Sequence, residues 1–402
     1  VYFREEIAAG VFTRKLARRY QALWFGSLSA MNLVLVSNNL GVMWVGVEAT
    51  TLLSAFLICI HASPSSLEAM WKYLLMCSVG VALAFAGILL LAAAASASIS
   101  GPDALLWTCL MNPSLALNPV LVKVSFIFIV VGFGTKAGLA PLHSWLPDAH
   151  SQSPSPVSAM FSGILLTTAM YGILRYIPLV ENATGNTGWG REVLVVLGLL
   201  SVLVGAAFVI GQQDVKRLLA YSSVENMGII ALGIGLGGAG VFAALLHTLN
   251  NSLCKSVSFC CAGRVGQIYG SLDMRRIKGM LKTSPLWGGG LLVSLMALIG
   301  VAPFALFFSE FLIVRAAWNQ SAYWAMGLLL FGLGLVFVGV LRKVIPMAWE
   351  PPETAPQPLS THRVEALLAW TPLALLLLLG LWIPDPLRAM ITQAAAVLGV
   401  TP

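Results

Sequence analysis

Long apolar runs with almost no charge are the feature that most constrains how this chain folds. Hydrophobic residues make up 58% of the 402, charged residues 10%, and the mean hydropathy is +0.87. A helix of about 20 apolar residues crosses a bilayer and satisfies its own backbone polar groups. The sequence therefore predicts an all-α polytopic membrane protein with about eleven transmembrane helices. Their predicted ranges are 21–38, 39–61, 70–98, 119–144, 153–176, 192–212, 218–237, 241–264, 286–314, 322–343 and 365–383.

The basic residues lie in short clusters between these runs, and the clusters predict the orientation of the chain. The net charge is +7, but basic clusters beside apolar runs are typical of cytoplasmic loops rather than of a nucleic-acid surface. Residues 1–20 are predicted to be a cytoplasmic approach segment, and the clusters at 216–217, 264–282 and 342–343 fall on the same side. We expect contact with a lipid bilayer and none with nucleic acid.

One membrane domain is predicted over 21–384, because no soluble domain fits between the spans. Its first repeat covers about 21–176, its second about 192–343, and a final helix 365–383, before a C-terminal tail at 385–402. Each repeat has five helices, so the second is inverted relative to the first. Each also contains a discontinuous helix, interrupted at Pro141 and at Pro303. Such paired breaks in inverted repeats are typical of membrane transport proteins.

Ionisable side chains inside the predicted spans are candidates for an ion path, because each costs roughly 2.5–3.5 kcal/mol at bilayer depth. Lys136 lies just before the break at Pro141, and Glu48 lies in mid-span without a basic neighbour in sequence. A carboxylate and an ammonium desolvated together cost less than either alone. We therefore expect Glu48 to pair with Lys136, although pairing alone would be a structural role.

A second set of polar residues follows one helix in the second repeat. His247, Asn251 and Lys255 recur at every fourth position and so share a helix face. They predict a proton relay, with interhelical hydrogen bonding as the alternative. Glu310 lies in the second interrupted helix. Glu225 lies in the first turns of its span, where snorkelling or capping competes with a path role.

A polar turn after the first break carries His143, Asp148 and His150. These residues make a weak metal site, because no fourth ligand lies nearby at a suitable spacing. Proton uptake is the better interpretation, with helix capping as the alternative for Asp148. The six cysteines show no C-x-x-C spacing, which favours small buried side chains over a redox centre.

Four segments resemble a known family almost word for word: VGVEATTLLSAFL, FGTKAGLAPLHSWLPDAHSQSPSPVSA, DVKRLLAYSSVENMG and HTLNNSLCKSVSF. They are similar to the antiporter-like subunits shared by respiratory complex I, Mrp-type sodium/proton antiporters and membrane-bound nickel–iron hydrogenases. Within that group EATTL, PSPVSA and SSVENMG look most like component F of hydrogenase-4 and the related formate hydrogenlyase subunit.

The resemblance implies a fourteen-helix subunit, of which the eleven spans would be the fourth to the fourteenth. It implies that Glu48 and Lys136 form the essential pair of the first half-channel. Lys255 would be the central lysine, His247 its neighbour in the relay, and Glu310 the terminal carboxylate. Two positions depart from the family. Thr167 stands where complex I members often have a second lysine, and Asn251 where many relatives have a histidine.

The resemblance also implies a proton-translocating subunit of an energy-converting hydrogenase or formate hydrogenlyase complex in the cell inner (plasma) membrane. The chain would carry no cofactor and no active site of its own. The nickel–iron centre and iron–sulfur clusters are expected in other membrane and peripheral subunits. Three alternatives stay open: a complex I-type NADH-quinone oxidoreductase subunit, an Mrp-type antiporter subunit, and a non-pumping membrane anchor of the same fold.

Overall fold

The structure is a computed structural model that describes residues 2–99, 101–112, 114–185, 187–352 and 363–398. These residues form helices and no strand, so the predicted all-α polytopic fold is confirmed. An N-terminal turn of helix precedes the bundle as α1 (Arg4–Ala8).

The first repeat contains four long helical regions and one made of shorter pieces. Its first part is α2 (Arg14–Val36), α3 (Leu40–Ile58), α4 (Pro64–Ala95) and α6 (Pro119–Ala137), with η1 (Gly101–Leu105) and α5 (Trp107–Leu110) in the loop before α6. Its second part is α7 (Trp145–Gln152), α8 (Ser155–Met160), the π-helical turn η2 (Phe161–Leu165) and α9 (Leu166–Leu174). The two repeats are joined by α10 (Ile177–Thr184).

The second repeat has the same order of elements. It consists of α11 (Trp189–Gly211), α12 (Val215–Leu236), α13 (Ala239–Tyr269), α14 (Met280–Thr283), α15 (Pro285–Leu298), α16 (Ala305–Asn319) and α17 (Tyr323–Trp349). Two further helices follow, α18 (Arg363–Leu381) and α19 (Asp385–Val397). The segment predicted to be a C-terminal tail is therefore mainly helical.

Within the described residues, eight helical stretches are long and apolar enough to cross a membrane. The other three predicted spans, 21–38, 241–264 and 286–314, also form helices, but these are either too polar or too short to count among the eight. Helix α2 begins with a basic segment and α13 carries the polar stripe, which lowers their hydropathy. The span predicted at 286–314 is divided into α15 and α16, which are 14 and 15 residues long.

Local sequence signals explain where several helices begin. The side chains of Thr13, Asn39, Asn118 and Asp214 each accept a hydrogen bond from a backbone N–H in the first turn of the following helix. Ser63 forms a reciprocal capping box at the start of α4. Such caps satisfy N–H groups that have no partner within the helix.

The two helix breaks use the same residues at the same spacing. Gly138 follows α6 with φ of 76°, and Gly300 follows α15 with φ of 71°, a backbone conformation that glycine adopts without steric cost. Pro141 and Pro303 each follow three residues later and end any continuation of the helix. The sequence alone therefore locates both breaks.

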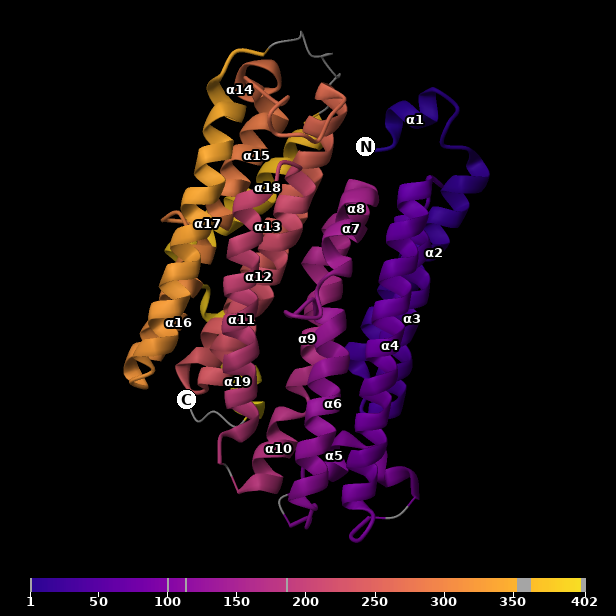
Figure 1. Cartoon of the computed structure of the whole chain (residues 1–402), viewed down its shortest axis with the longest axis vertical. Helices are drawn as coiled ribbons and strands as arrows, with labels where there is room; N and C mark the ends of the chain where they lie inside the picture. The colour runs from indigo at the N-terminus through magenta and orange to yellow at the C-terminus, as the bar shows by residue number, and fades with distance from the viewer. Residues whose placement is uncertain (1, 100, 113, 186, 353–362, 399–402) are drawn as a thin grey trace.

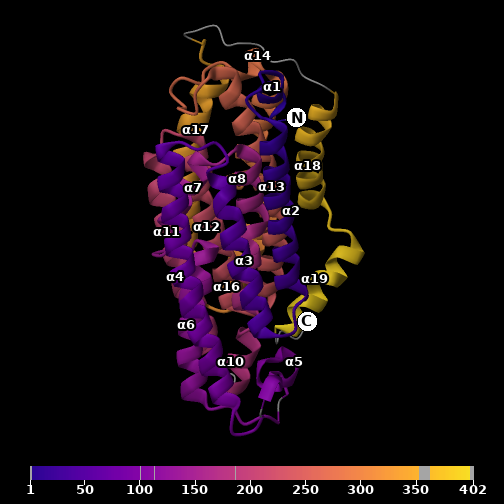
Figure 2. The ribbon, with the colours of Figure 1, turned by 90° about the vertical axis from the view of Figure 1, so that its right-hand side faces the viewer.

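Figures 1 and 2 show the helices standing side by side as an elongated bundle. The helices of the first repeat lie on one side of Figure 1 and those of the second on the other, with α7 and α8 between them. Every residue of α12 except Arg217 is buried. The N-terminal segment and α14 lie at the same end of the bundle, as the positive-inside prediction requires for these basic regions.

Two predicted connecting segments differ from expectation. The polar turn predicted at 142–153 is largely the helix α7, which packs against α4 and α12. The segment between the predicted spans 322–343 and 365–383 begins later than predicted, because α17 continues to Trp349. Its residues 353–362 lie outside the described part of the chain.

Candidate ion path

Lys136 is held in the core of the first repeat by hydroxyl groups. It lies in the last turn of α6 and is only 1% exposed. Its Nζ donates to Thr51 Oγ1 at 3.0 Å and to the Tyr73 hydroxyl, and it lies 4.6 Å from the centre of the Tyr73 ring. Tyr73 OH is in turn 2.6 Å from Ser54 Oγ. The negative end of the α6 dipole adds to this stabilisation of the ammonium.

The expected ion pair between Glu48 and Lys136 is not formed. Ser78 Oγ donates to Glu48 Oε1 at 2.9 Å, while Glu48 Oε2 is buried without a partner among the described residues. Lys136 instead reaches α3 at Thr51, one turn beyond Glu48. The hydroxyls of Thr51 and Tyr73 accept hydrogen bonds from the ammonium. The Lys136 ammonium and the Glu48 carboxylate therefore lie at neighbouring turns of α3 without forming an ion pair.

His247 connects three helices of the second repeat. Its Nε2 is 3.0 Å from Asn226 Oδ1 on α12, and its Nδ1 is 2.9 Å from Ser309 Oγ on α16. Asn226 Nδ2 donates to Ser222 O at 2.7 Å, so the amide oxygen faces the imidazole. His247 Nε2 therefore carries the proton of the neutral ring. The imidazole is fully buried, and its partner Ser309 directly precedes Glu310 in α16.

Asn250, and not the predicted Asn251, joins this network. Asn250 Nδ2 donates to Ala305 O at 2.9 Å and lies 3.4 Å from Ser309 Oγ. Ala305 is the first residue of α16, so this contact supports the second helix break. Both amide atoms of Asn251 are buried without a partner in the described residues. Its predicted place in the path stays a prediction.

Lys255 on α13 and Glu225 on α12 are two buried charged groups of the second repeat. Lys255 Nζ donates to the backbone oxygen of Leu219 at 2.9 Å. Glu225 is in the middle of α12 and 2% exposed, with Oε2 lacking a partner among the described residues. The snorkelling and capping alternatives for Glu225 are therefore wrong, because Glu225 is buried and Asp214 caps α12 eleven residues earlier.

Glu310 is beside a cavity of about 310 Å³ between α16 and α17. The carboxylate is buried and lies against Gly300 at the helix break. Phe307 and Phe337, both partly exposed, line the cavity with Gly334. The buried carboxyl group of Glu310 therefore lies beside a cavity at the outer face of the second repeat.

The segment after the first break is more buried than predicted. Asp148 pairs with Lys72 on α4 at 3.1 Å and with Arg217 on α12 at 3.2 Å, so it joins the two repeats rather than capping α7. His150 is fully buried, has no hydrogen-bond partner among the described residues, and stacks on Phe259. This burial excludes direct access from solvent in this conformation.

His143 is half-buried, and its Nδ1 has no partner among the described residues. Its ring lies near those of Phe208 and Tyr221. Lys216, predicted to mark the membrane boundary, is 3% exposed and donates to backbone oxygens of Ser151 and Ser153 at the end of α7. The lysine thus holds α7 against α12.

A π-helical turn brings the two halves of the path together. In η2, Gly163 O accepts from Ser252 Oγ on α13 at 2.5 Å. One residue earlier, Ser162 Oγ is 2.7 Å from Ser223 Oγ on α12. Among the described residues, Thr167 Oγ1 donates to the carbonyl oxygens of Gly163 and Ile164 in the preceding turn. π-turns widen the helix and are frequent at functional sites.

Sequence reasoning missed the neutral partners of the charged groups. Tyr73, Asn226 and Ser309 are polar residues within predicted membrane spans, which was the available signal. Asn226 and Ser309 each adjoin a predicted site glutamate. The side chains that they contact lie on other helices, so residue spacing along one helix does not predict these contacts.

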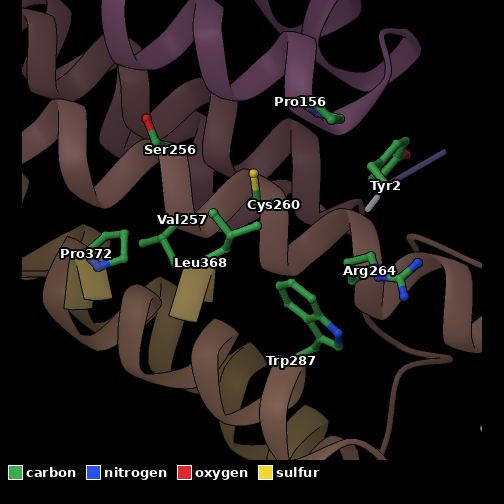
Figure 3. Close-up of a pocket in the computed structure, with 9 residues that line it drawn as sticks. All are labelled: Tyr2, Pro156, Ser256, Val257, Cys260, Arg264, Trp287, Leu368 and Pro372. Carbon is green, nitrogen blue, oxygen red and sulfur yellow. The ribbon is translucent and has the colours of Figure 1, made fainter. Parts of the chain in front are cut away.

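A separate cavity of about 280 Å³ lies away from this path (Figure 3). Its walls are mainly apolar and come from α8, α13, α15 and α18, with Tyr2, Arg264 and Trp287 at its edge. Arg264 is already within 3.5 Å of Glu365. We therefore assign this cavity no part in the path.

The fold and the buried charges together define an antiporter-like membrane subunit. The sequence profile described as "NADH:quinone oxidoreductase/Mrp antiporter, TM" matches residues 37–336. The chain belongs to this family and is a multi-pass membrane protein.

Individual relatives agree with this assignment. The hydrogenase-4 component F homolog of Methylacidiphilum infernorum (isolate V4) is 38% identical over 360 residues, which are 89% of this chain and 75% of that protein. Hydrogenase-4 component B of Escherichia coli (strain K12) is 30% identical over 335 residues, 80% of this chain but only 48% of that longer protein. A chain of the membrane-bound sulfane sulfur reductase, an archaeal respiratory membrane complex, superimposes with a TM-score of 0.85. It is 26% identical, and the match covers 95% of this chain and 76% of that one.

Proposed function

We propose that this chain is the proton-translocating membrane subunit of an energy-converting nickel–iron hydrogenase or formate hydrogenlyase complex in the cell inner membrane. The observation that carries the choice of complex is the 38% identity to a hydrogenase-4 component F homolog along 89% of the chain. Redox chemistry at a nickel–iron centre and iron–sulfur clusters would take place in partner subunits. This chain would move protons.

In the first repeat, Lys136 is the proposed proton carrier. A lysine can release its proton, whereas an arginine keeps its charge. The Tyr73 and Thr51 hydroxyls orient the ammonium, and Tyr73 continues to Ser54. Glu48, one turn away on α3, would stabilise the charged lysine when the two side chains approach. Making and breaking this contact would switch proton affinity.

In the second repeat, Lys255 and Glu310 are the proposed ends of a relay that includes His247. The neutral imidazole bridges Asn226 and Ser309 and can change its protonated nitrogen. Asn251 cannot exchange a proton as an imidazole can, so passage there requires water or side-chain movement. The cavity beside Glu310 leaves space next to the carboxyl group, which supports proton exchange at that end of the relay.

The assignment to a complex is tested by purification. The full complex is extracted from membranes in mild detergent with this chain as bait, and its subunits are identified by mass spectrometry. A nickel–iron hydrogenase large subunit with iron–sulfur partners supports the proposal. An NADH-oxidising arm, or Mrp-type membrane subunits alone, would assign the chain to one of the alternatives that the family description includes.

The unpartnered Asn251 favours one further candidate, a membrane anchor that keeps the fold but does not pump. Proton flux in vesicles containing Glu310→Gln or Lys255→Ala distinguishes the two. Loss of flux with an intact complex supports translocation. Unchanged coupling in both variants supports the anchor.

A further inference from the structure

We propose that an anionic phospholipid binds at the basic end of α17, with its phosphate headgroup in a cavity between α17 and the loop after α13. The cavity measures about 300 Å³. Its charged lining consists of Arg275, Lys278, Arg342, Lys343 and Glu350. It is distinct from the ion path and lies where a membrane-spanning helix meets the basic end of the bundle (Figure 1).

The cavity has an excess of positive charge. Lys278 pairs with Glu350 at 2.6 Å, and Arg275 with the neighbouring Asp273 at 2.7 Å. The Arg275 hydrogen bonds lower the pKa of the Asp273 carboxyl, so this pair is charged at neutral pH. Lys343 Nζ donates to the backbone oxygen of Val209, and neither Lys343 nor Arg342 forms an ion pair with a described residue. Arg342 and Lys343 are therefore cations without a carboxylate partner among the described residues.

The exposed face of α17 explains why the ligand is a lipid rather than a free anion. Val338, Arg342, Ile345 and Trp349 are spaced by four, three and four residues, so they form one stripe along the helix. Val338, Ile345 and Trp349 are 55%, 52% and 60% exposed. This stripe places a guanidinium among apolar side chains at a membrane interface, with a tryptophan at the level of the headgroups. Acyl chains can pack on the apolar positions while the phosphate meets the cations.

The test counts bound lipid. The chain, purified with its co-purifying subunits in mild detergent, is titrated with dioleoylphosphatidylglycerol or zwitterionic dioleoylphosphatidylcholine and observed by native mass spectrometry. We expect selective retention of phosphatidylglycerol. The double variant Arg342→Gln and Lys343→Gln should bind it at least about tenfold more weakly, since each basic residue near anionic lipid contributes measurably. The matched control, Arg14→Gln with Arg18→Gln, removes two exposed charges from the same end of the bundle outside the cavity.

Four results would overturn the proposal: equal retention of both lipids, equal loss in the control, displacement of the lipid by millimolar inorganic phosphate, or loss of a protein subunit with lipid retention unchanged. The third would indicate a free-phosphate site and the fourth a protein interface. The double variant Arg342→Lys and Lys343→Arg keeps both charges and should retain the lipid. Its failure to do so, with an unchanged unfolding midpoint, also contradicts the proposal.

Discussion

At the scale of single residues, the two lysines of the candidate path, Lys136 and Lys255, have neutral partners. Lys136 donates to two hydroxyls and Lys255 to a backbone oxygen, and neither forms an ion pair with a described residue. A lysine held in this way can lose its proton without leaving a carboxylate unpaired in the core. An ion-paired lysine could not, because breaking a buried pair is strongly destabilising. The arrangement suits a group that changes charge.

Lys136→Ala should abolish proton translocation, and Lys136→Arg should do so largely, because arginine retains the charge but does not release its proton. The measurement is dye-monitored acidification of membrane vesicles, with assembly of the complex checked by gel. Preserved pumping in Lys136→Arg would contradict the role of Lys136 as a proton carrier.

Tyr73→Phe should lower translocation roughly tenfold, because a hydrogen bond to a charged group contributes about 1.5–3 kcal/mol. The ring and Thr51 remain, so the effect should be partial. Tyr176→Phe is the matched control, since Tyr176 is equally buried but its hydroxyl has no partner among the described residues. Equal effects of the two variants on vesicle acidification would show that the Tyr73 hydroxyl has no specific role.

At the scale of elements, both broken helices expose backbone groups that must be satisfied in the protein interior. Trp145 Nε1 donates to Thr135 O at 2.9 Å, and Ser201 Oγ accepts from Ala140 N at 2.9 Å. In the second break, Asn250 satisfies Ala305 O. Each break is therefore stabilised by a neighbouring polar side chain, which leaves Lys136 and Glu310 next to an irregular backbone.

Gly334→Leu should reduce proton flux by narrowing the cavity beside Glu310. Gly334 lines this cavity, and a Cβ there would contact nothing within 4 Å, so the substitution should not disturb folding. Gly327→Leu is the control, because Gly327 has the same open surroundings on α17 but does not line the cavity. Flux is compared in vesicles with equal amounts of complex. Normal flux in Gly334→Leu would exclude the cavity as the route to Glu310.

At the scale of the whole molecule, the repeats are joined by a few polar contacts besides their apolar packing. Asp148 lies between Lys72 of the first repeat and Arg217 of the second. Ser252 and Ser223 contact the π-helical turn from the opposite repeat. The two halves of the ion path are therefore mechanically linked near the centre of the bundle.

Asp148→Asn should lower stability modestly, because the two partly exposed ion pairs it breaks contribute about 1 kcal/mol each or less. Thermal unfolding in detergent provides the measurement. Asp385→Asn is the control, since its contact with Arg388 lies within one exposed helix. An unchanged unfolding midpoint for Asp148→Asn, or an equal shift in the control, would argue against a role in joining the repeats.

The sequence by itself determined the membrane class, the positions of the spans, both helix breaks and the burial of Lys136, Lys255 and Glu310. These follow from apolar length, glycine and proline chemistry, and the cost of charge in a bilayer, all of which act locally along the chain. Only the tertiary structure decided which side chains form hydrogen bonds with one another. Thr51 and Tyr73 replaced Glu48 as the partners of Lys136, because these hydroxyls from two other helices are nearer to the ammonium. Asn250 replaced Asn251 because the rotation of α13 against α16 directs one amide, and not its neighbour, at the second break.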